Sequence, residues 1–383
     1  MQQLKPVKRL LRHLPSLGFL RPRFRRQVAT YLRLTAISFL FVFAVAFITP
    51  ARNLVGYFFI PSSWQPLSSG QILQMFYMEE QRYPVELGEG VSCDSIQEQM
   101  SAVDWQSLVS GIDSLPAYDK GYFLSIASHP DVYGTGPEDV ALIQETYGSF
   151  KPPMSGEWQR KLRLTFKVFA LAMKTFSVEF FLCEGSMLGA YRHHGYIPWD
   201  DDMDLCMNGS DWLRVKQILH CIPDFDVDTR SYMMYKFFWK RSELIKGEDL
   251  LRVPYLDIFF FTENDKYIWA LSRIKKHRIV FRKEDIFPLT TRPFEDMTVP
   301  LPKKFEYLCN TMYDPTMCVS RDYDHLKDRL LIPFYDYQYI PCAVFKKIYP
   351  FVERREIVVD GRQATLEVKK IGRKLLGNFT AFH

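Results

Sequence analysis

Residues 178–205 read VEFFLCEGSMLGAYRHHGYIPWDDDMDL, and this stretch decides the fold expected for the chain. Its first residues are mostly apolar and favour β structure, which predicts a short buried strand over 178–183. Glu184-Gly185-Ser186 then predict a glycine turn. Upstream, apolar residues recur at steps of three and four over 157–176, the spacing of one helix face. The order of helix, strand and turn indicates an α/β domain.

Four aspartates end this stretch, at positions 200, 201, 202 and 204. Residues 203–207 predict a second strand. Side chains two apart on a strand point to the same side, so Asp202 and Asp204 converge while Met203 faces the opposite layer. Buried without a partner, such carboxylates repel each other and resist desolvation. A divalent cation, Mg²⁺ or Mn²⁺, turns the same pair into a favourable site of hard oxygen ligands.

A further carboxylate, Asp257, interrupts the apolar run YLDIFFF at 255–261, which predicts a third buried strand. An isolated Asp-x-Asp is more often an acidic surface turn, and Asp257 could equally pair with Arg252. The context favours a metal site. Backbone N–H groups and a hydroxyl at Gly185 and Ser186 could cradle phosphate, and metals held by carboxylates usually complete their shell with substrate phosphates.

Residues 185–205 closely resemble the signature of the LicD/fukutin family of phosphotransferases, commonly Gly-Thr-Leu-Leu-Gly-x-x-Arg-His-x-Gly-x-Ile-Pro-Trp-Asp-Asp-Asp-x-Asp. The resemblance extends over about 157–314 and includes a Phe-Pro and Pro-x-x-x-x-x-Leu-x-x-x-Tyr segment within 286–313. The departures are Ser186 for Thr, Met187 for Leu and His194 for a frequent Lys, and every carboxylate is kept. The resemblance implies an α/β (α+β), nucleotidyltransferase-like mixed β-sheet flanked by helices.

The resemblance also implies a reaction, the transfer of a phospho-alcohol such as phosphocholine or ribitol phosphate from a CDP-linked donor to a glycan hydroxyl, with release of CMP. By this likeness the metal-binding and catalytic residues are Asp202, Asp204 and Asp257. The substrate-binding residues are Gly185, Ser186, Arg192, His193 and Asp201. The general base stays open between Asp257, Asp201 and His193.

Several neighbouring residues allow two interpretations. Lys236, Lys240 and Arg241 could bind a donor phosphate or an anionic acceptor, or form an ordinary basic strand edge. His193 and His194 suggest a metal pair, but adjacent residues on a strand point apart, which favours polar contacts instead.

Two other functions compete with phosphotransfer. One is a metal-dependent glycosyltransferase that uses a nucleotide sugar, and the other is a non-catalytic family member that assists a glycan-modifying complex. The turn at Gly185-Ser186 and the separate strand of Asp257 favour the phosphotransferase over the glycosyltransferase. Loss of a carboxylate would favour the non-catalytic role, and none is lost.

The N-terminal residues predict a membrane anchor. Residues 1–33 hold nine Lys and Arg and no Asp or Glu, and the next 18 residues, 34–51, carry no charge. This is close to the ~20 apolar residues that span a bilayer. The alternative is a cleaved signal peptide with Ala44-Val45-Ala46 as its cleavage site. Because Lys and Arg collect on the cytoplasmic side, we expect single-pass type II topology with the catalytic domain in the Golgi or ER lumen.

The rest of the chain completes the predicted organisation. Residues 52–153 read as a luminal stem with small helices, and 154–383 as the catalytic domain. Beyond the basic tail, the chain holds 40 of its 49 Lys and Arg and all 44 Asp and Glu. This slightly negative balance argues against nucleic-acid binding. The sequons at Asn208 and Asn378 suit a luminal body. Of seven cysteines at least one must be free, and the absence of CxxC argues against a zinc site.

Overall fold

A computed structural model describes residues 93–101, 105–115, 117, 119, 121–122, 149–230, 234–272, 275, 279–321, 323–327, 329–331 and 338–383. The chain divides into two units, Met1–Pro66 and Leu67–His383, and every described residue belongs to the second. The predicted tail 1–33 and anchor 34–51 lie outside the described residues, as does most of the predicted stem. Within the described part, no helix is both long and apolar enough to cross a membrane.

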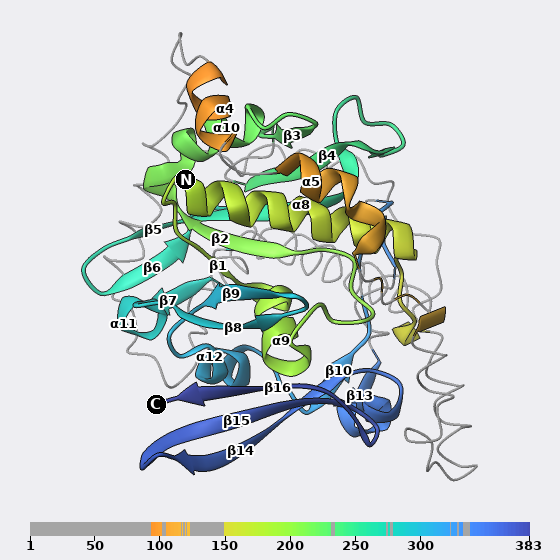
Figure 1. The fold of residues 1–383 in the computed structure, drawn as a ribbon, viewed down its shortest axis with the longest axis vertical. Coiled ribbons are helices and arrows are strands. Elements are labelled where there is room, and N and C mark those ends of the chain that lie inside the picture. The colour runs from red at the N-terminus through yellow and green to blue at the C-terminus, as the bar shows by residue number, and fades with distance from the viewer. Residues whose placement is uncertain are drawn as a thin grey trace, which may run out of the picture. The chain divides into compact units, whose positions relative to one another are not determined.

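A seven-stranded sheet forms the centre of the described unit (Figure 1). Its main path runs β1-β2-β5-β4-β3, and β6 and β7 continue from β5. The strands are β1 Phe180–Leu182, β2 Asp204–Asn208, β3 Phe225–Asp228, β4 Met234–Leu244, β5 Arg252–Glu263, β6 Tyr267–Ala270 and β7 Val280–Arg282. Because β2 and β5 are parallel and the other pairs antiparallel, the sheet is mixed, as predicted.

The three predicted strands are confirmed as β1, β2 and β5. All residues of β5 except its two ends are buried, which is why its sequence is apolar without alternation. The predicted helix is α8, Gly156–Thr175, which packs on β4 and β5. Ser155 caps it by accepting a hydrogen bond from the Trp158 N–H.

Helix α9, Glu184–His193, begins directly after β1. The glycine turn predicted at Gly185-Ser186 is therefore wrong, because both residues lie in the first turn of this helix. The strand assumed at His193-His194 is also wrong: His193 ends α9, and His194 follows in the left-handed conformation with φ 46°. Eight of the ten residues of α9 are buried, so the helix has no polar face that would give a helical period in the sequence.

Further helices surround this core. They are α4 Cys93–Ser101, α5 Trp105–Ser110, η2 Ile112–Ser114, η3 Gly209–Asp211, α10 Trp212–His220, α11 Lys283–Ile286, α12 Phe305–Met312 and η4 Cys342–Lys347. The first three are the small helices expected within 52–153. All three pack on α8, and α4 is also tied to the end of α10 by the disulfide Cys93–Cys221.

The C-terminal part adds four small sheets. The hairpin β8 Thr290–Phe294 with β9 Met297–Leu301 leads to the pairs β10 Met317–Val319 with β13 Tyr339–Pro341, and β11 Tyr323–Asp324 with β12 Arg329–Leu330. An antiparallel sheet closes the chain with β14 Phe351–Val359, β15 Arg362–Ile371 and β16 Lys374–Phe382. Helix α9 packs against β2, β8, α12 and β14, and so lies between the central and C-terminal sheets (Figure 1).

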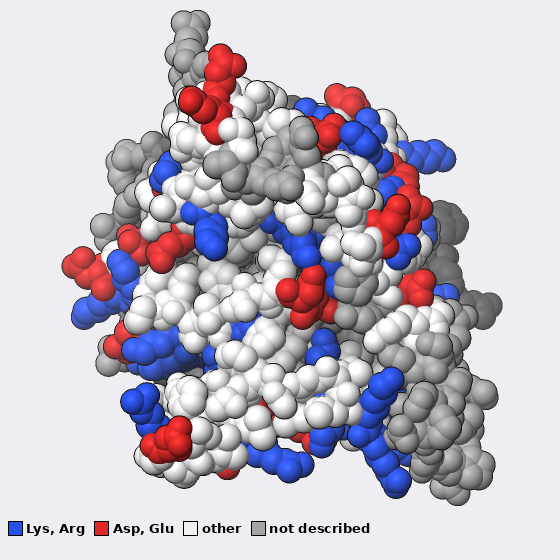
Figure 2. Space-filling model, in the orientation of Figure 1, with Lys and Arg blue, Asp and Glu red and all other residues white. Residues whose placement is uncertain are grey.

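Two further disulfides link segments of the described unit, and its surface carries charges of both signs. Cys183–Cys206 joins β1 to β2, Cys318–Cys342 joins β10 to η4, and Cys309 is free and buried, as the odd cysteine count requires. On the face that Figure 2 shows, acidic and basic side chains are interspersed, and neither sign covers it continuously.

Candidate active site

Asp202, Asp257 and His325 meet where strand β2 begins beside the middle of β5. Each offers a ligand atom, and these atoms lie within 4.8 Å of one another. Asp202 precedes β2, Asp257 lies within β5, and His325 follows β11. Asp204 pairs in register with Asp257 across the parallel strands. The structure therefore brings together the three aspartates that the sequence assigns to metal, and adds a histidine.

Asp204 is the most constrained of these carboxylates. Its backbone N–H donates to Ser186 Oγ at 2.8 Å, which fixes the start of β2 to α9. Its Oδ1 atom is buried and accepts no hydrogen bond from the described residues. Burial, and then the charge of Asp202, raise the pKa of Asp204 to about 8. A cation at this place would relieve the cost of a buried, under-coordinated carboxylate.

Gly185 keeps the space beside these carboxylates open. A Cβ atom built on it would lie 3.3 Å from Asp200 Oδ2 and 3.9 Å from Asp204 Oδ2. Asp200 was not among the predicted site residues, yet burial and the charge of Asp202 raise its pKa well above the ordinary value. Four carboxyl groups, those of Asp200, Asp202, Asp204 and Asp257, are therefore crowded together. Because Gly185 has no side chain, the first turn of α9 can approach them.

His325 is oriented by a contact with the buried carboxylate of Asp201. Asp201 Oδ1 is 2.9 Å from His325 Nδ1, and the Arg321 guanidinium donates to Asp201 Oδ2. His325 Nε2 is 3.2 Å from Asp202 Oδ2. Burial lowers the pKa of His325, but Asp202 and Asp201 outweigh it and hold the pKa at about 10. His325 could not be predicted from the sequence, because it lies 124 positions after Asp201 and belongs to no recognisable spacing.

Two lysines lie beside the cluster. Lys236 pairs with Asp257 across β4 and β5, and its Nζ is 2.6 Å from Asp257 Oδ1 and 4.0 Å from the Tyr255 ring centroid. Lys275 Nζ is 3.9 Å from a Glu184 carboxylate oxygen. The charge of Lys275 also lowers the pKa values of Asp202 and Asp204 against the raising effect of burial.

The basic residues near the site each contact a defined partner. Arg252 donates to the Ser242 carbonyl, so Asp257 pairs with Lys236 and not with Arg252. Strand β4 lies inside the sheet, which contradicts the interpretation as a basic edge. Lys240 and Arg241 instead form ion pairs with the acidic side chains of Asp226 and Asp224.

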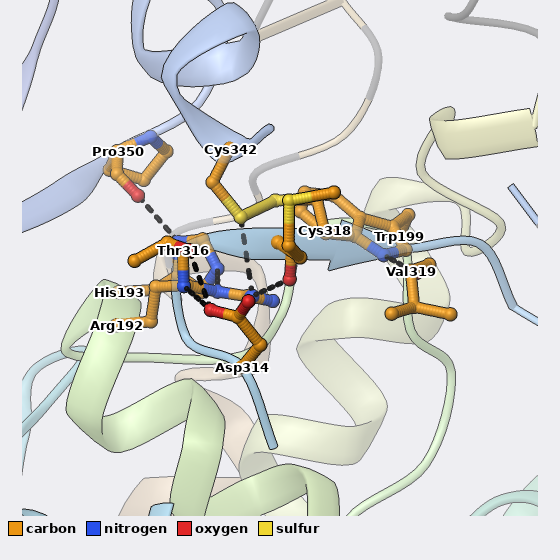
Figure 3. The surroundings of a disulfide bond; sticks show 10 residues. Arg192, His193, Trp199, Asp314, Thr316, Cys318, Val319, Cys342 and Pro350 are labelled. Carbon is orange, nitrogen blue, oxygen red and sulfur yellow. Dashed lines mark hydrogen bonds between the residues drawn. A yellow bond between two sulfur atoms is a disulfide. The ribbon is translucent and has the colours of Figure 1, made fainter. Parts of the chain in front are cut away.

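Arg192 and His193 lie at the far end of α9, beside the disulfide Cys318–Cys342 (Figure 3). Arg192 Nη1 donates to the Met317 carbonyl at 3.2 Å and to Cys342 Sγ at 3.4 Å. Arg192 Nε donates to His193 Nε2, so the other ring nitrogen, Nδ1, carries the proton and donates to a backbone carbonyl, that of Pro350, at 2.6 Å. These contacts join the signature segment to the C-terminal part, and a contact of Arg192 or His193 with substrate stays a prediction.

Two more residues of the signature have structural contacts. His194 Nε2 lies 2.6 Å from Glu367 Oε2, a polar contact of the expected kind. Trp199 is 3% exposed and donates to the Val319 carbonyl, consistent with a core residue (Figure 3).

Comparison with known proteins agrees with this geometry. Residues 177–304 match the family model described as LicD/FKTN/FKRP, nucleotidyltransferase domain. This match covers about a third of the chain. The matched region contains Asp202, Asp204 and Asp257 and ends before His325, so the histidine reaches the site from outside the LicD-family match.

Curated relatives resemble this chain at modest identity. It is 26% identical over 208 residues to ribitol-5-phosphate transferase FKTN of Mus musculus, and 27% over 203 residues to ribitol 5-phosphate transferase FKRP of the same species. It is 26% identical over 122 residues to lipopolysaccharide cholinephosphotransferase LicD of Haemophilus influenzae. In that order, the alignments cover 51%, 50% and 29% of this chain and 42%, 38% and 45% of the relatives. The chain thus spans less than half the length of each.

Proposed function

We propose that this chain is a metal-dependent phosphotransferase that moves a phospho-alcohol from a CDP-linked donor to a glycan hydroxyl and releases CMP. The observation that carries the proposal is the convergence of Asp202, Asp204 and Asp257 beside the first turn of α9, within a LicD-family domain. The relatives named as ribitol-phosphate and cholinephosphate transferases support the reaction class.

The donor set fits a divalent cation. Carboxylate oxygens are the ligands that Mg²⁺ and Mn²⁺ prefer, and Asp204 Oδ1 has no hydrogen-bond donor among the described residues. Asp202, Asp257 and His325 offer ligand atoms close to one another, and Asp204, which pairs in register with Asp257, would add a further carboxylate to the ion. Bound there, the ion would neutralise the diphosphate and stabilise the charge that develops on the leaving group.

The chain's own residues would bind and orient the donor. Backbone N–H groups at the start of α9, around Gly185 and Ser186, favour a phosphate group because they lack helical partners and carry the positive end of the helix dipole. Lys236 and Lys275 add positive charge beside the aspartates. These groups position the diphosphate against the cluster, and positioning supplies most of the catalysis in phosphoryl transfer.

The transfer itself is a displacement at phosphorus. The acceptor hydroxyl oxygen forms a bond to the phosphorus that bears the alcohol, and the bond from that phosphorus to the bridging oxygen breaks. CMP leaves with the electron pair, and the hydroxyl proton passes to a base. Of the three candidate bases, Asp257 lies in the cluster and has one oxygen, Oδ1, bonded to Lys236. Both oxygens of Asp201 and both ring nitrogens of His193 are engaged in hydrogen bonds.

We also propose that the protein is a single-pass type II membrane protein whose catalytic domain lies in the Golgi or ER lumen. The disulfides Cys93–Cys221, Cys183–Cys206 and Cys318–Cys342 support an oxidising compartment. An epitope placed at His383 should resist protease in intact microsomes and be digested after detergent. Digestion without detergent would contradict luminal topology.

A panel of donors tests the reaction class. The purified full chain is incubated with Mg²⁺ or Mn²⁺, with glycans whose free hydroxyls serve as acceptors, and with CDP-ribitol, CDP-glycerol, CDP-choline or common nucleotide sugars, and nucleotide release is measured beside the double variant Asp202→Ala, Asp204→Ala. CMP release from a CDP-alcohol that the variant loses supports the proposal. Release from a nucleotide sugar alone would point to glycosyl transfer, and no release from any donor by the folded protein would contradict an enzymatic role.

A further inference from the structure

Glu184, the first residue of α9, is held in a backbone conformation that glutamate rarely adopts. Its φ is 47°, in the left-handed region, where any side chain beyond glycine is strained. The flanking contacts impose this conformation. The Cys183 N–H donates to the Asp204 carbonyl at 3.2 Å, and the Asp204 N–H donates to Ser186 Oγ. Because residues on both sides are fixed to the same residue of β2, the chain has to change from strand to helix at position 184.

The side chain of Glu184 is unfavourably placed as well. It is 2% exposed, and it lies close enough to the aspartates to act on them. Burial and the charge of Asp202 are the main causes that raise the pKa of Asp204, and the charge of Glu184 adds to them. Glycine at this position would remove both the backbone strain and the buried charge. A strained, buried carboxylate beside an active site therefore points to a function.

Lys275 is the cation next to this carboxylate. Its Nζ lies 3.9 Å from a Glu184 carboxylate oxygen and 4.8 Å from the centroid of the Phe259 ring. The Lys275 side chain is 22% exposed, so its ammonium group can still reach a ligand. Burial raises the pKa values of Asp202 and Asp204, and the charge of Lys275 acts against it. The ammonium therefore lies beside the aspartates and beside the first turn of α9.

We propose that Glu184 is a positioning residue that holds the Lys275 ammonium where it contacts a phosphate group of the donor. The inference rests on the proposed function and deepens it, because it explains how a lysine in the connection between β6 and β7 acquires a fixed position. A lysine side chain has many rotamers, and an ion pair with a rigid partner selects one of them. Glu184 is such a partner, since the strand-to-helix change fixes its backbone.

The charge of Glu184 by itself predicts the opposite effect on binding. Donor phosphates are anionic, so a buried carboxylate near them is repulsive. If Glu184 acted through its charge alone, Glu184→Gln would strengthen the binding of a nucleotide. If Glu184 acts by holding Lys275, the same variant weakens it. The direction of the change therefore separates the two roles.

The test is equilibrium binding of CDP to the full chain at saturating Mn²⁺, for Glu184→Gln, Lys275→Gln and the double variant. Lys275→Gln should weaken CDP binding by about tenfold, the effect of one hydrogen bond to a charged group. Glu184→Gln should weaken it by about fivefold, and the double variant should bind CDP no more weakly than Lys275→Gln, because one effect acts through the other. Mn²⁺ affinity without nucleotide should fall by less in Glu184→Gln than CDP affinity does.

A second variant, Glu184→Gly, separates positioning from a structural role. It removes the carboxylate and relieves the left-handed backbone, so Tm should rise by about 2 to 4 °C while CDP binding weakens. Asp360→Gly is the matched control, because Asp360 has φ 50° in the exposed turn between β14 and β15. It relieves the same conformation and should leave CDP binding unchanged.

Several results would overturn the inference. They are CDP binding that is unchanged or stronger in Glu184→Gln, single effects that multiply in the double variant, a Tm of Glu184→Gly that falls together with CDP binding, and a wild type that does not bind CDP. A loss of Mn²⁺ affinity in Glu184→Gln that exceeds the loss of CDP affinity would also overturn it and assign Glu184 to the metal.

Failure of the proposed function gives a different result. The predicted CDP effects in a protein that releases CMP from no donor would keep Glu184 and Lys275 as a phosphate-binding pair without the proposed reaction. CMP release by Glu184→Gln with the wild-type KM would leave the proposed function standing and overturn the positioning role.

Discussion

Replacing Asp201 by asparagine should uncouple His325 from the site while keeping the shape of the side chain. The Asp201 side chain is fully buried, and the side chains of Arg321 and His325 are 17% and 22% exposed. In Asp201→Asn, the new amide group would turn a donor toward one of these cations. Removing one partner of a buried ion pair costs about 3 to 5 kcal/mol. Since both cations keep some solvent, we expect about 3 kcal/mol, or roughly 6 to 12 °C in Tm.

The second effect of this variant is on metal binding. Removing a carboxylate that orients a metal-binding histidine typically lowers the metal affinity by about 10- to 100-fold. Urea unfolding and a titration with Mn²⁺ measure the two effects on the same preparation. Asp226→Asn is the matched control, because Asp226 also pairs with a histidine, His220 at 3.2 Å, but at the surface, where such a pair contributes about 1 kcal/mol or less. The reasoning is refuted if Asp201→Asn behaves like this control in both assays.

Three further predictions concern the same region. The folded-state pKa values of Asp204, about 8, and His325, about 10, are raised, so the stability that Asp204 contributes is lost as pH rises from 3.8 to about 8, and that of His325 as pH rises from 6.5 to about 10; a flat stability of metal-free protein across this range would refute this. Reducing Cys318–Cys342, whose cysteines are 24 positions apart, should cost about 3 kcal/mol and weaken Mn²⁺ binding, because His325 lies in the closed loop; unchanged Mn²⁺ affinity in reduced protein would count against this. Lys236→Gln should raise the KM for the CDP donor by about tenfold without weakening Mn²⁺ binding, and loss of Mn²⁺ binding would instead assign Lys236 a structural role.

The helix and strands that build the site could be predicted because local patterns encode them. Helix α8 has one apolar face, and β5 is an apolar run interrupted by Asp257. A carboxylate in such a buried strand indicates a functional site. Parallel pairing of β2 and β5 then places Asp257 beside Asp204. The same logic failed for α9, where glycine indicated a turn. A helix that is buried on nearly every side has no alternation of polar and apolar faces, and its first turn accepts glycine and serine readily.

What the sequence could not give depends on contacts between distant segments. His325 reaches Asp201 only because β10, β13 and the disulfide Cys318–Cys342 fold the C-terminal part back onto the signature segment. No local spacing records that arrangement. The same holds for Lys236. The sequence left open whether it lies on a strand edge, whereas the structure places β4 inside the sheet and pairs Lys236 with Asp257.

The central claim is that the buried aspartates bind a divalent ion and thereby support phospho-alcohol transfer. The most direct test measures CMP release and the phosphodiester product from the preferred CDP-alcohol as a function of Mn²⁺ concentration, for the wild type and for Asp204→Asn. The account predicts saturable, metal-dependent release by the wild type and a loss of about 100-fold or more in the variant. Release that needs no metal, or that the variant sustains at the wild-type rate, would contradict it.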